Sequence, residues 1–105
     1  MQDTSHPPSL PPALNDEFIG KVAIVTGAGQ GMGREVAKRL SAGGARLIIN
    51  DVSEIAAKET QDVLIEAGGE AYAVPGDVTS SSDVRSMVDS AIQHYGSLEI
   101  LVNNA

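Results

Sequence analysis

The chain has 105 residues, of which 42% are apolar, and its formal net charge is −7. This length allows one small domain, and the absence of cysteine excludes a disulfide framework and a thiolate metal site. The acidic balance argues against nucleic acid and anionic membranes as partners, and His6 and His94 lie too far apart in the sequence for metal-ligand spacing.

Residues 1–17 are predicted to form a disordered, proline-rich leader ahead of the folded part, residues 18–105. Proline has no N–H and disfavours helix at the residue before it, so this stretch should be extended and mobile. The leader lacks the apolar core of a secretory signal and the arginines of a transit peptide, and we expect a cytoplasmic protein. A proline-rich docking motif is the alternative. Four of the five prolines lie in the leader: Pro7, Pro8, Pro11 and Pro12.

The first predicted elements are a strand, a glycine-rich loop and a helix. Lys21–Val25 is a short apolar run, typical of a buried parallel strand. The loop Thr26–Gly33 follows, and beyond it we predict a helix that ends at Gly43–Gly44. The apolar residues of this helix share one face with Gly33, as in an amphipathic helix: Val36, Ala37 and Leu40.

The loop holds four glycines within seven residues, which a purely structural turn rarely needs. Gly27 would make the turn, Gly31 would let the main chain approach a phosphate, and Gly33 would let the helix pack on the strand. The first N–H groups of the helix have no internal partners and carry partial positive charge, which suits a pyrophosphate. A tight turn without a ligand is the alternative.

Asp51 follows the second predicted strand, Arg46–Asn50, at the end that faces the ligand crevice of a parallel sheet. A carboxylate there can accept hydrogen bonds from both hydroxyls of an adenosine ribose, and it would repel a 2′-phosphate. Asp51 lies eighteen residues beyond Gly33, close to the separation in dinucleotide-binding folds. The alternative role is a helix N-cap, but Ser53 can serve as that cap.

The remaining pattern predicts a helix over 53–67, a strand over 71–74, a helix from Ser80 to Gly96 and a strand over 98–102. This βαβαβαβ alternation with short links implies a parallel sheet with helices on both faces and the strand order 3-2-1-4. Tyr72 and Tyr95 are expected in core elements. The second helix is expected to bury Ala56, Thr60, Val63, Leu64 and Ala67, and the third Val84, Met87, Val88, Ala91, Ile92 and Tyr95.

Three motifs resemble the short-chain dehydrogenase/reductase family, over about Phe18 to Ala105. Thr26–Gly33 has the form T-G-x-x-x-G-x-G, and Asp77–Val78 follows the third predicted strand. Leu101–Ala105 resembles the N-N-A-G signature, cut before its glycine. The resemblance implies an α/β fold, a Rossmann-type doubly wound parallel sheet, here truncated after the fourth strand.

The resemblance also implies a binding site for a nicotinamide cofactor. Asp77 would meet the adenine amino group, although it could instead cap the following turn, and the Val78 backbone would meet the ring edge. Asn104 and Ala105 would line the nicotinamide-side ribose, whereas Asn103 would tie the strand ends together. The predicted cofactor-binding residues are Gly27, Gln30, Gly31, Met32, Gly33, Asp51, Asp77, Val78, Asn104 and Ala105.

The residues near the adenosine ribose favour NAD over NADP. Relatives that prefer the phosphorylated cofactor often carry a basic residue before the second motif glycine or just after the second strand. Here those positions hold Gln30, Asp51 and Val52. Arg34 and Arg46 are not expected to reach a 2′-phosphate.

The family's reaction is hydride transfer between a nicotinamide and an alcohol or carbonyl carbon, and its acid/base is a tyrosine four residues before a lysine. Here Tyr72 is followed at that spacing by Gly76, and Tyr95 by Glu99. No catalytic residue is therefore assigned, and the chain alone is predicted to be inactive. The hypothesis is an N-terminal fragment of a short-chain oxidoreductase, whose full-length form acts on a small alcohol or carbonyl substrate and is a homo-oligomer.

Two other functions remain open. A stand-alone dinucleotide-binding module without catalysis would be complete at Ala105. A methyltransferase that binds an adenosyl cofactor also uses a strand-end carboxylate, but it does not need the segment Asn103–Ala105. The substrate is not readable, because the part of the family's chain that shapes its pocket has no counterpart here.

Overall fold

The computed structural model describes residues 17–104 and contains one four-stranded parallel sheet. Its strand order is β3-β2-β1-β4, which confirms the predicted order. Most of the predicted leader, and Ala105, lie outside the described residues. The strands are β1 Val22–Val25, β2 Arg46–Ile49, β3 Glu70–Ala73 and β4 Ile100–Val102.

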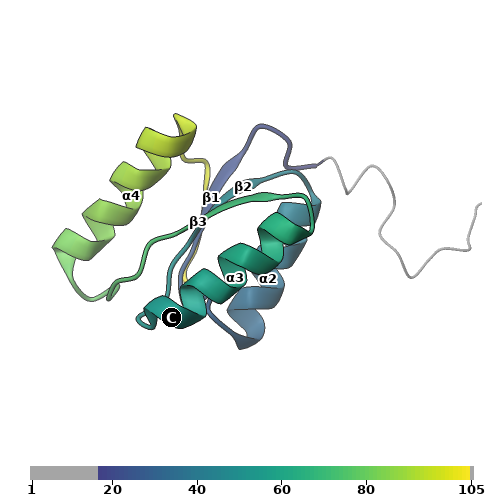
Figure 1. Ribbon diagram of the computed structural model, residues 1–105. Helices are drawn as coiled ribbons and strands as arrows, with labels where there is room; N and C mark the ends of the chain where they lie inside the picture. The colour runs from purple at the N-terminus through teal and green to yellow at the C-terminus, as the bar shows by residue number, and fades with distance from the viewer. Residues whose placement is uncertain (1–16, 105) are drawn as a thin grey trace, which may run out of the picture.

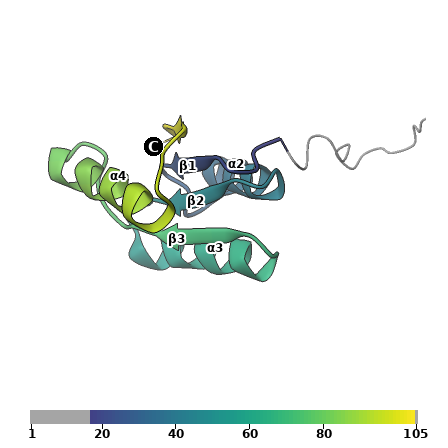
Figure 2. The same cartoon turned by 90° about the horizontal axis from the view of Figure 1, so that it is seen from above.

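Three helices connect these strands and form the outer layers of the described chain. The helices α2 and α3 cover one face of the sheet and α4 covers the other (Figure 1), and the view from above shows the same separation (Figure 2). None of the helices in residues 17–104 is long and apolar enough to cross a membrane. Their bounds are α2 Gly31–Ala42, α3 Glu54–Glu66 and α4 Ser81–Tyr95.

The helix ends lie close to their predicted positions because local residues cap them. The Ser53 hydroxyl accepts the Ala56 N–H at the start of α3, and the Ser80 hydroxyl accepts the Asp83 N–H at the start of α4. Gly96 ends α4 with φ +86°, in the left-handed region that glycine enters without strain.

The sheet separates two apolar clusters. The larger one lies between the sheet and the helices α2 and α3, and the smaller one lies beneath α4. All four residues of β1 are buried, as expected for a strand covered on both faces. The smaller cluster consists of Val22, Ile24, Ile48, Met87 and Ala91.

The prediction of which α3 residues are buried is only partly correct. Ala57, Thr60 and Leu64 are buried, whereas Val63 and Ala67 are exposed. Because the helix packs mainly on β2 and β3, the buried stripe is narrower than the run of apolar residues along it.

The predicted stripe of α4 is buried only along one edge. Met87 and Ala91 are buried, but Val84, Val88 and Ile92 are 40%, 37% and 50% exposed. Tyr72, predicted to be a core residue, is 43% exposed. The reason is that α4 packs mainly over β1 and β2, so it covers its face of β3 only in part, through His94 beside Tyr72, and its own outer side is exposed.

Candidate dinucleotide-binding site

The glycine-rich loop connects β1 to α2 at the carboxyl edge of the sheet, where ligands of such sheets bind. Gly27 and Gly31 have φ of +61° and +59°, so both need glycine's conformational freedom. A Cβ on Gly31 would meet no atom within 4 Å, whereas a Cβ on Gly33 would collide with the Gly27 carbonyl oxygen. Gly31 therefore presents open backbone, and Gly33 allows α2 to approach the loop at Gly27, where the prediction had the helix packing on the strand.

The amino end of α2 differs from those of α3 and α4. Its N-cap residue, Gln30, has extended backbone and makes no side-chain capping bond, and the first turn holds no acidic residue. The other two helices have serine caps and an acid in the first turn, Glu54 in α3 and Asp83 in α4. The partial positive charge at the start of α2 is therefore left for an external anion.

Asp51 lies directly beside this loop. Its Oδ2 accepts the Gly29 N–H at 3.0 Å and its Oδ1 accepts the Ser53 N–H at 3.0 Å. Since the Ser53 hydroxyl caps α3 through the Ala56 N–H at 3.1 Å, the capping role does not fall on Asp51. The half-buried carboxylate is instead held at the loop, at the end of β2.

Gly29 is a site residue that the sequence reasoning left without a role. A Cβ there would lie 2.6 Å from the Ala56 Cβ and 2.7 Å from Asp51 Oδ2. Only glycine allows the loop to approach both Asp51 and α3. In the sequence, Gly29 is recognisable only as the second of the four loop glycines.

Asp77 forms a tight turn at the start of the α4 segment. Its Oδ1 accepts both the N–H and the hydroxyl of Thr79, each at 2.8 Å. These two bonds, the one from the Thr79 N–H first, hold the pKa of the Asp77 carboxyl below its ordinary value. Asp77 Oδ1 therefore caps this turn. The Gly76 N–H donates to the Asp51 carbonyl at 3.1 Å, which places this segment next to Asp51, and half-buried Val78 packs against the α4-side cluster.

Both asparagines at the end of β4 contact the beginning of the loop. The Thr26 hydroxyl lies 3.2 Å from Asn103 Oδ1 and accepts the Asn104 N–H at 2.9 Å. Asn104 Nδ2 also donates to the Gly27 carbonyl at 3.2 Å. The tie between strand ends that was predicted for Asn103 is therefore shared by Asn104.

Arg34 and Thr60 contact the loop from its helix side, which the sequence reasoning missed. Arg34 Nη2 donates to the Gly29 carbonyl at 2.6 Å, so this side chain lies closer to Asp51 than its helix position suggests. The Thr60 hydroxyl donates to the Ala28 carbonyl at 2.8 Å. A polar residue on the apolar face of α3 was the only signal in the sequence.

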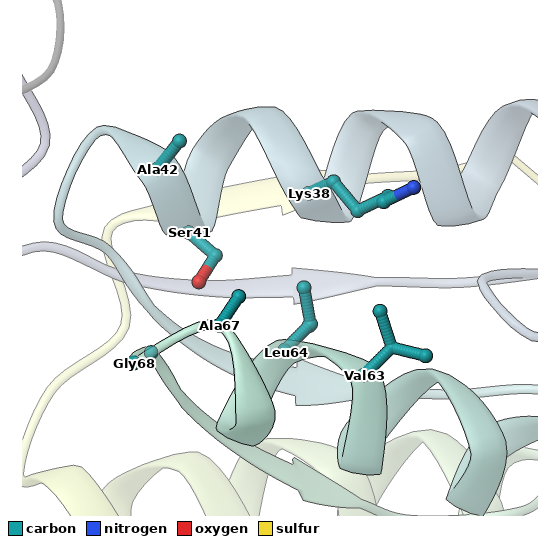
Figure 3. Close-up of a pocket in the computed structure, with 8 residues that line it drawn as sticks. Lys38, Ser41, Ala42, Val63, Leu64, Ala67 and Gly68 are labelled. Atoms are coloured by element: carbon teal, nitrogen blue, oxygen red, sulfur yellow. The ribbon is translucent and has the colours of Figure 1, made fainter.

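A separate hollow of about 330 Å³ lies between α2 and α3. It is formed at the carboxyl ends of both helices, so it is on the opposite edge of the molecule from the loop. Within residues 17–104, no group of three His, Asp or Glu side chains is placed to hold a metal. Figure 3 shows Ser41 of α2 pointing toward Leu64 and Ala67, whereas Ala42 points away from α3 and the Lys38 side chain runs along α2.

The sequence profile of the family described as short chain dehydrogenase matches residues 21–105. The chain therefore belongs to the short-chain dehydrogenase family. It is 41% identical over 91 residues to the 7alpha-hydroxysteroid dehydrogenase of Escherichia coli strain K12. The crystal structure of a hydroxysteroid dehydrogenase from Escherichia coli superposes with a TM-score of 0.82 at 40% identity, covering 84% of this chain and 37% of that one.

The relatives differ in how much of their length this chain spans. The alignment with the 7alpha-hydroxysteroid dehydrogenase covers 87% of this chain but only 36% of that protein. The short-chain dehydrogenase/reductase homolog YusS of Bacillus subtilis is 39% identical over 88 residues, which is 83% of this chain and 81% of that protein. The family thus includes a protein of similar size.

Proposed function

We propose that this chain is the cofactor-binding part of an NAD-dependent short-chain oxidoreductase. The observation that carries the proposal is the uncapped, acid-free start of α2 directly beside the Asp51 carboxylate. A dinucleotide presents an anionic diphosphate and a ribose diol, and these two features match that pair of groups. The bare backbone at Gly31 leaves room for the close approach of a phosphate.

Each part of the cofactor has its proposed partners. The diphosphate is held by the loop, the adenosine ribose by Asp51, and the adenine by Asp77 and the Val78 backbone. Asn104 and Ala105 line the nicotinamide-side ribose. The loop residues that surround the diphosphate are Gly27, Gln30, Gly31, Met32 and Gly33.

The bound nicotinamide would supply or accept a hydride, and the chain's own residues bind and orient it. The substrate class is an alcohol or carbonyl compound, which is consistent with the names of the relatives. We propose that the acid/base machinery and the contacts of a homo-oligomer belong to a longer, cytoplasmic protein.

A second candidate function is a stand-alone dinucleotide-binding module. The observation that favours it is the similar size of the YusS homolog, of which the alignment covers 81%. Both candidates require NAD binding by the described residues. They differ in whether any longer product of the gene turns over an alcohol or a ketone.

The test is NAD binding to the purified chain by isothermal titration calorimetry, with the fold verified by circular dichroism. We expect a dissociation constant between about 1 μM and 1 mM, the range of ordinary cofactor and substrate affinities. Absence of binding by a folded chain would contradict both candidates.

The matched variants are Gly31→Ala and Gly68→Ala. Both glycines have positive φ, and an added Cβ would meet no atom within 4 Å at either site, so both substitutions strain the backbone without a steric clash. Only Gly31 faces the proposed diphosphate. We expect Gly31→Ala to weaken NAD binding by about tenfold and Gly68→Ala to leave it unchanged. Equal effects of the two substitutions would contradict the proposed diphosphate site at Gly31.

A further inference from the structure

Thr60 is a completely buried hydroxyl on the apolar side of α3. It donates to the Ala28 carbonyl at 2.8 Å and accepts the Arg34 Nε–H at 2.8 Å. Buried polar groups need partners, and this hydroxyl uses both its donor and an acceptor site. Its two partners lie in the loop and in α2, so Thr60 joins three segments of the fold.

Arg34 holds the next carbonyl of the loop. Its Nη2 donates to the Gly29 carbonyl at 2.6 Å, and its ion pair with Glu59 at 3.4 Å is exposed and contributes little. The carbonyls of Ala28 and Gly29 are therefore both held from the side of α2 and α3.

The N–H groups of the same two residues are held from the opposite direction. The Ala28 N–H donates to the Asn50 carbonyl at 2.8 Å and the Gly29 N–H donates to Asp51 Oδ2 at 3.0 Å. The peptide unit that joins Ala28 to Gly29 is thus bonded at both its carbonyl and its N–H, and its rotation is restricted. Since a carbonyl oxygen turned toward a phosphate would repel it, this restriction matters for anion binding.

We propose that Arg34 and Thr60 are positioning residues for the cofactor loop. By holding the carbonyls of Ala28 and Gly29 toward the interface of α2 and α3, they keep both carbonyl oxygens turned away from the diphosphate. They act through the loop and do not contact the cofactor. The inference rests on the proposed function, because it assigns these residues to diphosphate binding.

A purely structural role in α2–α3 packing predicts a different pattern of effects. Thr60→Val removes the hydroxyl with little change in shape, and Thr60→Ser keeps the hydroxyl. The test compares the dissociation constants of ADP-ribose and adenosine for the chain and both variants. Adenosine has no diphosphate, so it reports on the proposed ribose and adenine contacts alone, those of Asp51, Asp77 and Val78.

We expect Thr60→Val to weaken ADP-ribose binding about tenfold and to leave adenosine binding unchanged. Thr60→Ser should bind ADP-ribose to within about twofold of the parent affinity. Equal weakening of both ligands, or no weakening of either, would overturn the positioning role. Arg34→Lys keeps the charge but not the fork that reaches two acceptors, and it should behave as Thr60→Val does.

Amide hydrogen exchange of the ligand-free chain separates failure of this inference from failure of the proposed function. We expect faster exchange at Gly29 and its loop neighbours in Thr60→Val, with unchanged exchange at Ala37 and Leu64 in the helices. Unchanged loop exchange would overturn the positioning role whatever the ligand results are. A parent chain that binds no ADP-ribose would instead overturn the proposed function.

Discussion

Asp51 accepts a hydrogen bond from the Gly29 N–H at 3.0 Å, through the oxygen Oδ2. The carbonyl of the same glycine accepts the Arg34 guanidinium at 2.6 Å. A carboxylate and a guanidinium therefore bind opposite sides of one loop residue. Because the Thr60 hydroxyl and the Gly29 carbonyl hold the Arg34 guanidinium, Asp51 is the charged group that we place at the ribose.

The first prediction concerns cofactor selectivity. Asp51 should favour NAD over NADP by roughly ten- to a hundredfold, because charge-assisted bonds to the ribose are worth about 1.5–3 kcal/mol and a 2′-phosphate would be repelled. Asp51→Ala should lose most of this preference. The measurement is the ratio of the two dissociation constants for the chain, or of kcat/KM for a longer protein.

The control for this prediction is Glu54→Ala. It removes another carboxylate nearby, in the first turn of α3, without changing the loop. Equal efficiency with both cofactors in the parent, or an unchanged preference in Asp51→Ala, would show that Asp51 does not determine the selectivity.

The second prediction concerns Gly33. An alanine in a helix is ordinarily more stable than a glycine by about 0.5–1 kcal/mol. Here the added Cβ would strike the Gly27 carbonyl and lie 2.7 Å from Asn104 Nδ2. We expect Gly33→Ala to lower the free energy of unfolding by about 1–3 kcal/mol, as over-packing does. The measurement is equilibrium unfolding in urea.

Met32→Ala is the matched control, since Met32 lies in the same turn and is 73% exposed. It should leave the free energy of unfolding nearly unchanged. A stabilised Gly33→Ala variant would show that the loop and α2 can separate without loss.

The third prediction concerns acid stability. Val22 donates its N–H to Glu99 Oε1 at 2.7 Å, and the Glu99 N–H donates to the Val22 carbonyl at 2.9 Å. The Val22 N–H, followed by the Ser97 hydroxyl, lowers the pKa of Glu99. Its carboxylate therefore stabilises the fold above the ordinary glutamate pKa, and this contribution is lost as the pH falls through the lowered pKa.

The measurement is the melting temperature of the parent and of Glu99→Gln across the acid range. The parent should be the more stable at neutral pH, and the difference should disappear in acid, because protonated Glu99 is uncharged, as glutamine is at every pH. A difference that is constant with pH would contradict the assignment to ionised Glu99.

The fourth prediction concerns self-association. Leu101 in β4 is 64% exposed and lines a groove of about 220 Å³ with Val84 and Val88 of α4. In residues 17–104, β4 pairs only with β1, so its other edge is open. Exposed apolar strand edges recruit other chains, so we expect the chain to self-associate and to be marginally stable. Light scattering measures the association, and thermal melts measure the stability.

The variant Leu101→Lys should reduce this association. Ile55→Lys is the control, because Ile55 is also exposed, at 76%, but lies on α3 on the other face of the sheet. A clean monomer with a sharp cooperative melt, or equal effects of the two lysines, would contradict the assignment to the β4 edge.

The fifth prediction is that the purified chain neither oxidises alcohols nor reduces carbonyls. A tyrosine that acts as the general acid/base near neutral pH needs a lowered pKa. Burial, and then the charge of Glu70, instead raise the pKa of Tyr95. Turnover measured by nicotinamide absorbance, with contaminating enzymes excluded, would overturn the prediction.

The sequence by itself determined the order of elements, the strand order and most of the helix ends. These features depend on signals close together along the chain: the alternation of apolar runs, the serines at positions 53 and 80, and the glycines that follow the helices. It also placed Asp51 and the loop at one edge of the sheet, because the carboxyl ends of parallel strands meet there.

Only the tertiary structure decided which side of each helix is covered and which polar groups meet. Periodicity shows that Met87 and Val88 share a face, but it does not show that α4 covers only part of the sheet. Arg34 and Thr60 are 26 residues apart, and Thr26 and Asn104 are 78 apart. Such pairs leave no local pattern, because hydrogen bonds between elements depend on how the elements pack, and packing is a property of the whole fold.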